Sequence, residues 1–508
     1  MERVWDIETD ASSNIYLIGD FADSLCVNGQ SYAGYGVSDS FVMKFSSSGA
    51  FIWAQTFGSV AEDSAISVAT DPLGNCYVSG YFVDTLRVQE QSVVSNGGWD
   101  TYIVKLDPQG ELLWLRSFGG PLNDIAYGLA VSPLGRVYVA GWFADSISFP
   151  GGSSIVSAGG SDVFCLALDL AGDYLWSRRA GTAGVDYGYQ VAADEDGNAY
   201  VTGVAGMGAI FGPFALSSNG MYVTKLNPQG QFLWLNSGAN GAVVNIAIQA
   251  ETGASQSGMV CGRLSQDVTY GEFSYSPINE SDDAYYATFD ANTGQWLELN
   301  TFGGAWADNG KDVDLSFDPV IVFNFEGSAD FGDQTFNSSG ERDLVLAYGF
   351  PDLQFVSAGG QFSEVPSCIK QLPNGKIMIA GWHFGSFQLG AWNLDSGNSS
   401  NQNAFLACFD PAVAVDDDLI AVPNPIEYGP NPFSTELKLK LNKADSSSSK
   451  LKIYNQRGQL IRNLEPDSAG KTEAFYSWDG RDQAGKICSA GIYLIRWGTR
   501  CCKVLLNN

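Results

Sequence analysis

The stretch Cys76-Tyr-Val-Ser-Gly80 is one of seven similar copies in the first 410 residues, and this recurrence decides the fold. Each copy is a short run of β-forming residues, and six of the seven end in glycine. The copies end at Gly19, Gly80, Gly141, Gly203, Gly262, Asn324 and Gly381. Subtracting successive positions gives spacings of 61, 61, 62, 59, 62 and 57 residues. A fixed period of this kind is typical of repeat architectures.

Each period contains about four β runs and no helical pattern. About twenty residues after the glycine comes a second run such as Tyr102-Ile-Val-Lys-Leu106, followed by the type I turn sequence Asp107-Pro-Gln-Gly110. A third run is built on an aromatic residue, and an apolar run then opens the next repeat. The aromatic residues are Trp53, Trp114, Trp176, Trp234, Trp296 and, in the sixth copy, Phe355.

Several of these runs are apolar on both faces, which indicates strands covered on both sides. Four-stranded blades stacked around an axis satisfy that requirement, typically with four to eight blades in a ring. A two-sheet sandwich cannot absorb seven equal units. We therefore expect an all-β fold, with residues 1–412 forming a seven-bladed β-propeller of repeats about 61 residues long.

The motifs resemble the SBBP family of β-propeller repeats. The shared pattern is matched most closely at residues 75–80, 100–110 and 113–120, while repeats four to seven are degenerate. The resemblance covers most of the first 410 residues. It implies the fold and says nothing about a ligand, because one fold hosts many functions.

Closure of the ring is left open by the sequence. The seventh repeat has its Gly381 and Cys408 runs but no tryptophan run. Three explanations are compatible with this: residues 412–422 complete the ring, the seventh blade is short, or residues are missing at the start of the chain.

Composition changes after Pro411. Residues 413–427 are expected to form an acidic Pro/Asn linker, and residues 428–508 a separate module with five β runs. The alternation in Leu437-Lys-Leu-Lys-Leu441 suits a half-exposed antiparallel strand. An Ig-like β-sandwich is the expected fold of this module.

The module resembles the C-terminal sorting domain of the type IX secretion system, of the FlgD-Ig-like kind. The matching segments are residues 430–433, 451–461, 478–482 and 489–493. The resemblance implies export across the outer membrane of a Bacteroidetes-like bacterium, with the secretion machinery as partner of residues 428–508. Cys501-Cys502 departs from the basic residues common in that family.

Charge separates the two parts of the chain. Residues 428–508 hold 13 Lys+Arg and 7 Asp+Glu, a net charge of +6, whereas the remainder holds 14 and 49, a net charge of −35. A propeller this acidic repels phosphate backbones, so we expect no nucleic-acid partner. Solubility explains the charge, and a cation-dependent surface is the alternative.

The sequence contains no run of 18 apolar residues and no secretory leader in Met1-Glu-Arg-Val-Trp-Asp6. A sorting domain without a leader suggests that the natural N-terminus precedes this sequence. The expected location is secreted or on the outer cell surface. Cys76, Cys165, Cys261 and Cys408 lie in runs of different blades and are expected to be buried free thiols; a bond among Cys488, Cys501 and Cys502 is left open.

No catalytic residue can be named from the sequence. The one histidine, His383, stands where Phe21, Phe82 and Phe143 stand in other repeats, which indicates a structural place. The calcium-like run at residues 194–198 matches hairpin turns in other repeats and lacks the twelve-residue ligand spacing. We expect no metal site and no cofactor, with Ca²⁺ as a weak alternative.

The residue after each repeated glycine varies, and at three copies it is a large aromatic: Tyr81, Trp142 and Trp382. If this position faces a rim or the central channel, these side chains are candidate ligand-binding residues, since aromatic faces stack on sugars and anchor proteins. Packing between blades is the competing explanation. The favoured function is non-enzymatic binding or adhesion to a protein or glycan. The alternative is an extracellular carbohydrate-active hydrolase or lyase that uses carboxylates on the propeller face.

Overall fold

The computed structural model divides the chain into two compact units, residues 1–416 and 417–508, and each is described by itself. The described residues of the first unit are 2–248, 257–389, 392–395 and 402–411. Those of the second are 426–429, 437–442, 451–455, 460–464, 466, 468–469, 473–483, 485–489, 491–497 and 500–506. The predicted linker lies outside the described residues up to residue 425, as does the segment 412–422 considered for ring closure.

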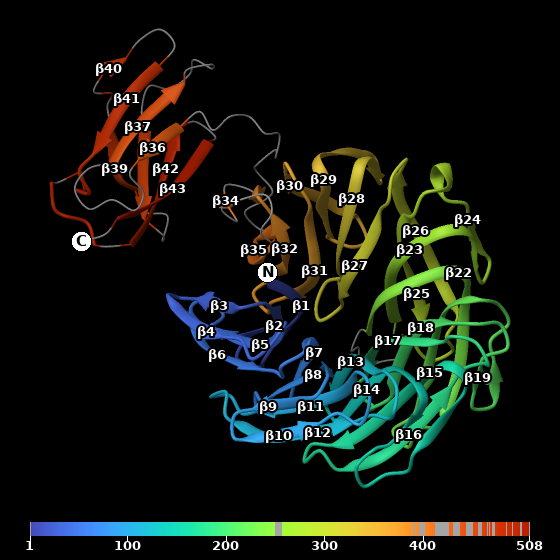
Figure 1. Ribbon diagram of the computed structural model, residues 1–508. Helices are drawn as coiled ribbons and strands as arrows, with labels where there is room; N and C mark the ends of the chain where they lie inside the picture. Colours follow the sequence, from blue (N-terminus) through green and yellow to red (C-terminus); the bar gives the residue numbers. More distant parts are fainter. Residues whose placement is uncertain are drawn as a thin grey trace. The chain divides into compact units, whose positions relative to one another are not determined.

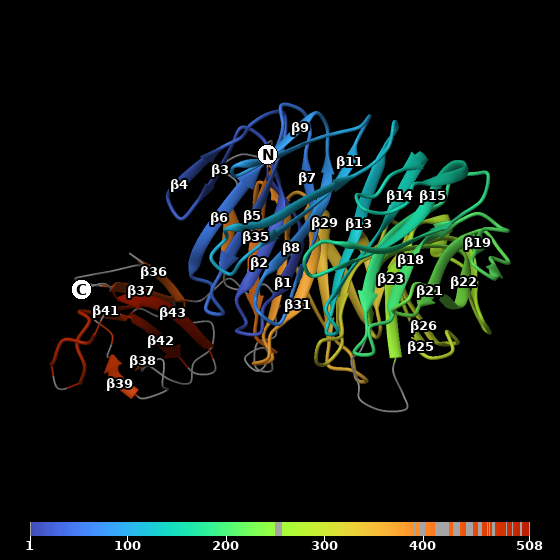
Figure 2. The ribbon, with the colours of Figure 1, turned by 90° about the horizontal axis from the view of Figure 1, so that it is seen from below.

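The first unit is all-β in its described residues, apart from one 3₁₀ turn at Ile278–Glu280, and its sheets are arranged as in a propeller (Figure 1). Three four-stranded antiparallel sheets come first. They consist of β1 (Glu2–Thr9), β2 (Ile15–Phe21), β5 (Asp39–Phe45) and β6 (Phe51–Phe57); β7 (Ser64–Thr70), β8 (Cys76–Phe82), β11 (Asp100–Leu106) and β12 (Leu112–Phe118); and β13 (Asp124–Ser132), β14 (Arg136–Ile147), β15 (Ile155–Asp169) and β16 (Tyr174–Ala180). Figure 2 shows the unit edge-on, with its strands running from one face toward the other.

A 14-stranded sheet follows, and a three-stranded sheet ends the unit. The main path of the larger sheet is β17 (Tyr187–Ala193), β18 (Ala199–Ala205), β21 (Gly220–Leu226), β22 (Phe232–Ile248), β23 (Ser257–Tyr270), β25 (Asp283–Asp290), β26 (Trp296–Gly304), β28 (Val320–Phe331), β29 (Gln334–Tyr348), β30 (Gln354–Gly360), β33 (Ser386–Leu389) and β34 (Trp392–Asp395). Off this path lie β24 (Phe273–Tyr275) and β27 (Asn309–Asp314). The last sheet contains β31 (Glu364–Gln371), β32 (Ile377–Phe384) and β35 (Gln402–Phe409).

Short hairpins extend several repeats beyond the four strands expected. They are β3 (Ser24–Val27) with β4 (Gln30–Ala33), β9 (Thr85–Val88) with β10 (Gln91–Val94), and β19 (Ile210–Phe211) with β20 (Phe214–Ala215). Each hairpin lies in the chain between the second and third strands of its repeat. These hairpins were not expected from the repeat motifs.

The prediction of seven separate blades differs from this hydrogen-bonding pattern, which gives five large sheets among the described residues. The reason lies in the degenerate later repeats. The 17-residue strand β22 pairs with β21 through its first half and with β23 through its second. Two further junctions are bridged by glycines, Gly303 and Gly304 toward β28 and Gly359 and Gly360 toward β33.

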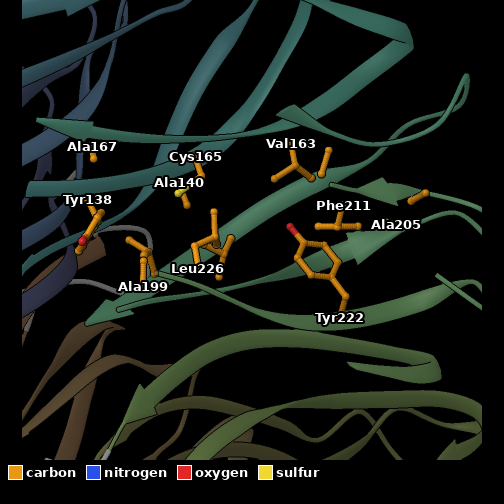
Figure 3. Packing of buried hydrophobic residues seen from close by; sticks show 14 of the residues in the cluster. Tyr138, Ala140, Val163, Cys165, Ala167, Ala199, Ala205, Phe211, Tyr222 and Leu226 are labelled. Carbon is orange, nitrogen blue, oxygen red and sulfur yellow. The ribbon is translucent and has the colours of Figure 1, made fainter. Parts of the chain in front are cut away.

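The core of the first unit lies between sheets and explains why the strands are apolar on both faces. In one cluster, Val163 from β15 lies near Phe211 and Tyr222 of the following repeat, and Tyr138 from β14 lies near Ala199 of that repeat (Figure 3). The rings of Phe211 and Tyr222 lie 4.6 Å apart, and the Tyr138 hydroxyl donates to the carbonyl of Gly197 at 2.6 Å. Tertiary burial of this kind is the main stabilising term.

The repeated tryptophan and the repeated turn that follows the second β run are connected by a hydrogen bond between neighbouring repeats. Nε1 of Trp53 donates to the Pro108 carbonyl at 3.1 Å, and Trp114 donates in the same way to Leu170 at 3.1 Å. Pro108 belongs to the turn of the next repeat. Trp176 donates likewise to the Pro228 carbonyl at 2.9 Å, so the first three tryptophans each bond to the repeat that follows, which accounts for the recurrence of both motifs there. Trp296 instead donates to the Ser237 carbonyl of the preceding repeat at 3.1 Å, and Trp234 Nε1 is buried with no hydrogen-bond partner among the described residues.

The first and last sheets meet through an apolar cluster. Val4 and Leu17 from the first sheet pack with Cys368 and Met378 from the last. The last sheet has three strands among the described residues, and because residues 412–422 lie outside them, the explanations for ring closure stay open.

The cysteines follow the prediction in three of four places. Cys76, Cys165 and Cys261 are buried free thiols, but Cys408 is exposed. It lies on β35, the outermost described strand of the three-stranded sheet, so no strand covers it from outside. Cys488 is a free thiol, and the side chains of Cys501 and Cys502 lie outside the described residues.

The second unit contains two four-stranded antiparallel sheets. One is formed by β36 (Ile426–Gly429), β37 (Leu437–Asn442), β41 (Glu473–Trp478) and β40 (Ser468–Ala469), the other by β39 (Leu460–Leu464), β38 (Leu451–Asn455), β42 (Gly491–Trp497) and β43 (Arg500–Leu506). Leu437, Trp478 and Ile453 share one buried cluster drawn from both sheets. This arrangement agrees with the expected sandwich.

Candidate functional site at the central channel

A cavity of about 310 Å³ lies where the first strands of all seven sequence repeats meet. Its lining comes from β1, β7, β13, β17, the end of β22, β27 together with the turn after it, and β31. Each of these inner strands contacts the next, and β31 contacts β1. The inner strands therefore form a closed circuit around a central channel.

Every inner strand carries a β-bulge at the same place in each repeat, just before the residues that line the cavity. The bulge residues are Trp5, Ile66, Tyr127, Tyr189, Val244, Lys311 and Ser367. A bulge re-aims side chains and bends its strand. The residue after the bulge lines the cavity in five repeats, namely Asp6, Ser67, Gln190, Asn245 and Asp312.

Asp6 and Asp312, the two aspartates among the residues that follow a bulge, join neighbouring inner strands. Asp6 accepts hydrogen bonds from Ser67 Oγ at 3.0 Å and from the Val68 amide at 2.9 Å. Asp312 accepts from Asn245 Nδ2 at 2.5 Å and from the Ile369 amide at 2.6 Å. Burial raises the pKa of Asp6 to about 7 and that of Asp312 well above its usual value. Donors occupy both oxygens of each carboxyl, which favours a structural role over acid–base catalysis.

Two residues farther along each strand, the channel is strongly asymmetric. Glu8, Asp314 and Lys370 line one side, from three consecutive inner strands. Alanines occupy the equivalent positions of the other four, namely Ala69, Ala130, Ala192 and Ala247. Nζ of Lys370 lies 3.1 Å from Glu8 Oε1 and 3.5 Å from Asp314 Oδ1, so the charges on this side are paired.

An aromatic cluster borders the channel at the bulge end. It consists of Tyr127, Trp142, Tyr187 and Tyr189, all half-buried. Trp142 meets Tyr187 edge-on at 5.4 Å, Tyr187 stacks on Tyr189 at 6.0 Å, and Tyr189 meets Tyr127 edge-on at 5.9 Å. Two adjacent repeats thus present one continuous set of partly exposed rings.

The three aromatic residues predicted from the sequence share one structural position but are not brought together. Trp142 belongs to the aromatic cluster, whereas Tyr81 packs against Trp99 at 5.2 Å and Trp382 against Phe384 at 5.6 Å. Among the described residues, no ring contact joins any two of the three. Their role in binding stays a prediction.

Three cations lie at the same end of the channel, on the two repeats that follow the aromatic cluster in the ring. Arg263 stands at the position of Trp142 and forms an ion pair with Asp282 at 2.9 Å. Arg342 pairs with Glu326 at 3.6 Å. Lys311 is a bulge residue, like Tyr189, and is half-buried.

The other sequence candidates occupy structural places. His383 is buried, its Nδ1 lies 3.1 Å from the Gly385 carbonyl oxygen, and its ring is near Phe405. Asp194 accepts from the Asn198 amide at 2.7 Å and from Tyr200 at 2.9 Å, within a hairpin turn. In the described parts of the chain, His, Cys, Asp and Glu form no group of three suited to a metal ion. The Ca²⁺ alternative stays untested.

The bulge residues were missed in the sequence, although a signal was present. They recur at the repeat period, with spacings of 61, 61, 62, 55, 67 and 56 residues. Their chemical types differ from repeat to repeat, which hides them from a search for a shared motif. That variability at a fixed structural position is itself typical of a binding surface.

Family models match two short parts of the chain. The model described as "Beta-propeller repeat" (SBBP) matches residues 175–205, and that described as "FlgD Ig-like domain" matches residues 431–497. These matches agree with the propeller arrangement of the first unit and the two sheets of the second. No helix among the described residues is long and apolar enough to cross a membrane.

Two curated proteins are similar to part of this chain. An uncharacterized WD repeat-containing protein of Acanthamoeba polyphaga mimivirus is 25% identical over 191 residues, 32% of this chain and 14% of that protein. Regulatory protein FlaEY of Caulobacter vibrioides is 25% identical over 187 residues, 34% of this chain and 19% of that protein. Both matches therefore span less than a fifth of the relative's length. Among solved structures, a europium-containing methanol dehydrogenase matches with 12% identity and a TM-score of 0.32, covering 73% of this chain and 79% of that one.

Proposed function

We propose that this chain is a non-enzymatic binding propeller that holds a glycan against the aromatic cluster of Tyr127, Trp142, Tyr187 and Tyr189. The observation that carries the proposal is the continuity of these half-buried rings at the end of the channel. Aromatic rings provide a large apolar face with a polar edge, which suits sugar rings. Two of the four, Tyr127 and Tyr189, stand at inner-strand bulges, and all four are carried by paired strands, which limits the ordering needed when a ligand binds.

A glycan array probed with the full chain tests this proposal. Saccharides that bind should lose affinity when Trp142→Ala removes one ring of the cluster. Trp306→Ala is the matched control, because Trp306 is an exposed tryptophan outside the cluster. The proposal would be contradicted if both variants lost saccharide affinity equally. It would also be contradicted if the chain bound a protein ligand whose affinity Trp142→Ala left unchanged.

We propose further that the first unit is built of seven radial units, although its hydrogen bonds connect some of them. The closed circuit of seven inner strands supports this count. Glycine-bridged junctions and the long strand β22 join neighbouring units without changing their number. An experimental density map viewed along the channel would test it, and five radial arms would contradict it.

We also propose that residues 428–508 direct export to the outside of the cell, as a type IX sorting domain would. The Ig-like match at residues 431–497 supports a separate module of the required fold. In a bacterium with that secretion system, the full chain behind a secretory leader should reach the medium or the cell surface. Deleting residues 428–508 should retain the propeller in the periplasm, and unchanged export would refute the role.

A further inference from the structure

Two of the three cations, Lys311 and Arg263, follow glycines at which the backbones of neighbouring repeats come close together. A Cβ built on Gly310 would lie 2.8 Å from the amide nitrogen of Gly262 and 3.0 Å from the Tyr285 carbonyl oxygen. Lys311 follows Gly310, and Arg263 follows Gly262. The same packing joins Gly188 to Gly141, where a Cβ would lie 2.7 Å from the Gly141 carbonyl oxygen. The backbone at Lys311 is therefore brought close to that at Arg263, as the backbone at Tyr189 is brought close to that at Trp142.

Lys311 differs from the two arginines in its pairing. Arg263 and Arg342 each have a carboxylate partner, but within the described part of the chain Lys311 has neither an ion pair nor a hydrogen bond through its side chain. Burial, together with the charges of Arg342 and Arg263, lowers the pKa of Lys311 to about 8. A half-buried ammonium beside two guanidinium groups is unfavourable unless an anion approaches it.

The aromatic cluster reaches toward this cationic group. Burial raises the pKa of Tyr189 to about 12, while the charge of Arg263 acts in the opposite direction. Arg263 thus lies within electrostatic reach of both Tyr189 and Lys311. One ligand could place a ring on the aromatic side and an anion on the cationic side.

We propose that Lys311, with Arg263 and Arg342, binds the carboxylate of an acidic sugar whose neighbouring ring stacks on the aromatic cluster. This inference rests on the proposed glycan-binding function and adds the chemical class of the ligand. Ammonium and guanidinium groups bind carboxylates through charge-assisted hydrogen bonds, with Arg often bidentate.

The proposed ligand has a single carboxylate at the cationic group and is not a polyanion with a carboxylate on every unit. The chain outside residues 428–508 has a net charge of −35, which repels an extended polyanion. The local group has three cations and two carboxylates, Asp282 and Glu326, and so a net charge of +1. That charge matches a single acidic sugar within an otherwise neutral saccharide.

Titration calorimetry on the full chain tests the proposal with two matched pairs of saccharides: 3′-sialyllactose with lactose, and glucuronoxylotriose with xylotriose. We expect at least one acidic member to bind more tightly than its neutral partner. Lys311→Met should weaken that binding about ten- to a hundredfold, the range for a hydrogen bond to a charged group. Arg342→Gln should also weaken binding of the acidic saccharide. Lys376→Met is the control and should leave that binding unchanged, because Lys376 lies in the turn between β31 and β32, at the end of the last sheet away from the bulges.

The outcomes separate this inference from the proposed function. Equal affinity for acidic and neutral members, or no effect of Lys311→Met in a variant with an unchanged thermal midpoint, overturns the acidic-sugar inference and leaves glycan binding intact. Absence of binding to every saccharide on an array overturns both. Binding of poly-glutamate in preference to all saccharides would assign the cationic group to an acidic peptide and overturn the inference.

Discussion

Lys370 and Glu8 lie 362 residues apart in the sequence, yet Nζ of Lys370 lies 3.1 Å from Oε1 of Glu8. The two residues stand on the last and first inner strands. Burial acts to lower the pKa of Lys370, but the carboxylates of Asp314 and Glu8 outweigh it and hold the pKa above its usual value. The ring is therefore closed by charge as well as by the apolar cluster around Val4 and Cys368.

Lys370→Met should destabilise the first unit by about 2–4 kcal/mol, because it leaves two carboxylates in the channel without their cation. The thermal midpoint of the full chain measures this. Lys376→Met is the control, since Lys376 is more exposed and lies 3.8 Å from Asp410, and its effect should stay within about 1 kcal/mol. Equal effects of the two variants would show that the Lys370 pairs do not contribute to closure.

Gly310→Ala should destabilise the first unit by about 1–3 kcal/mol, the usual cost of overpacking. Its new methyl group would meet the backbone of Gly262 and Tyr285 at 2.8 and 3.0 Å, and neither can rotate away. Gly206→Ala is the matched control, because a Cβ there meets nothing closer than 3.6 Å. Thermal unfolding of both variants decides the matter, and a neutral Gly310→Ala would mean that the repeats can separate at this junction.

Much of the architecture could be predicted because the repeat motifs are the contacts between repeats. Trp53 and the turn at Pro108 recur together since one donates a hydrogen bond to the other. The sheet connections could not be predicted, because they depend on a few backbone pairs made by glycines, such as Gly303 with Asp330. The aromatic and cationic groups were found only in part. Trp142 follows a visible motif, whereas Tyr189 and Lys311 share a bulge that only the backbone reveals.

The junctions between repeats contain pairs of buried carboxyls, and these predict an unusual pH dependence. In one pair, Asp100 accepts from the Asn96 amide at 2.6 Å and Asp124 from the Gly120 amide at 2.7 Å. Burial raises the pKa of Asp124 to about 8, with Asp100 adding to the shift, and burial raises that of Asp100 to about 6. Asp63 and Asp308 are equivalent to Asp124 and have a pKa of about 7, again because of burial.

A carboxyl whose pKa is raised by folding binds its proton more tightly in the folded state, so stability falls as pH rises. The window runs from about pH 4, the usual pKa of unfolded aspartate, to about pH 8. The thermal midpoint should therefore be higher at pH 5 than at pH 8. Asp124→Asn should flatten this dependence, and a midpoint that rises from pH 5 to pH 8 would contradict the raised pKa values.

Thiol labelling tests the placement of Cys408 on the outer strand of the last sheet. Burial raises the pKa of Cys261 well above its usual value, and Cys76, Cys165 and Cys368 are buried in the same way. The reactive species is the thiolate, so these four should resist a disulfide reagent in the folded protein. Cys408 and Cys26 are exposed and should react first. Cys408→Ser should remove one fast-reacting thiol, whereas Cys76→Ser should remove none; a protected Cys408 would show that further chain covers β35 and completes the last sheet.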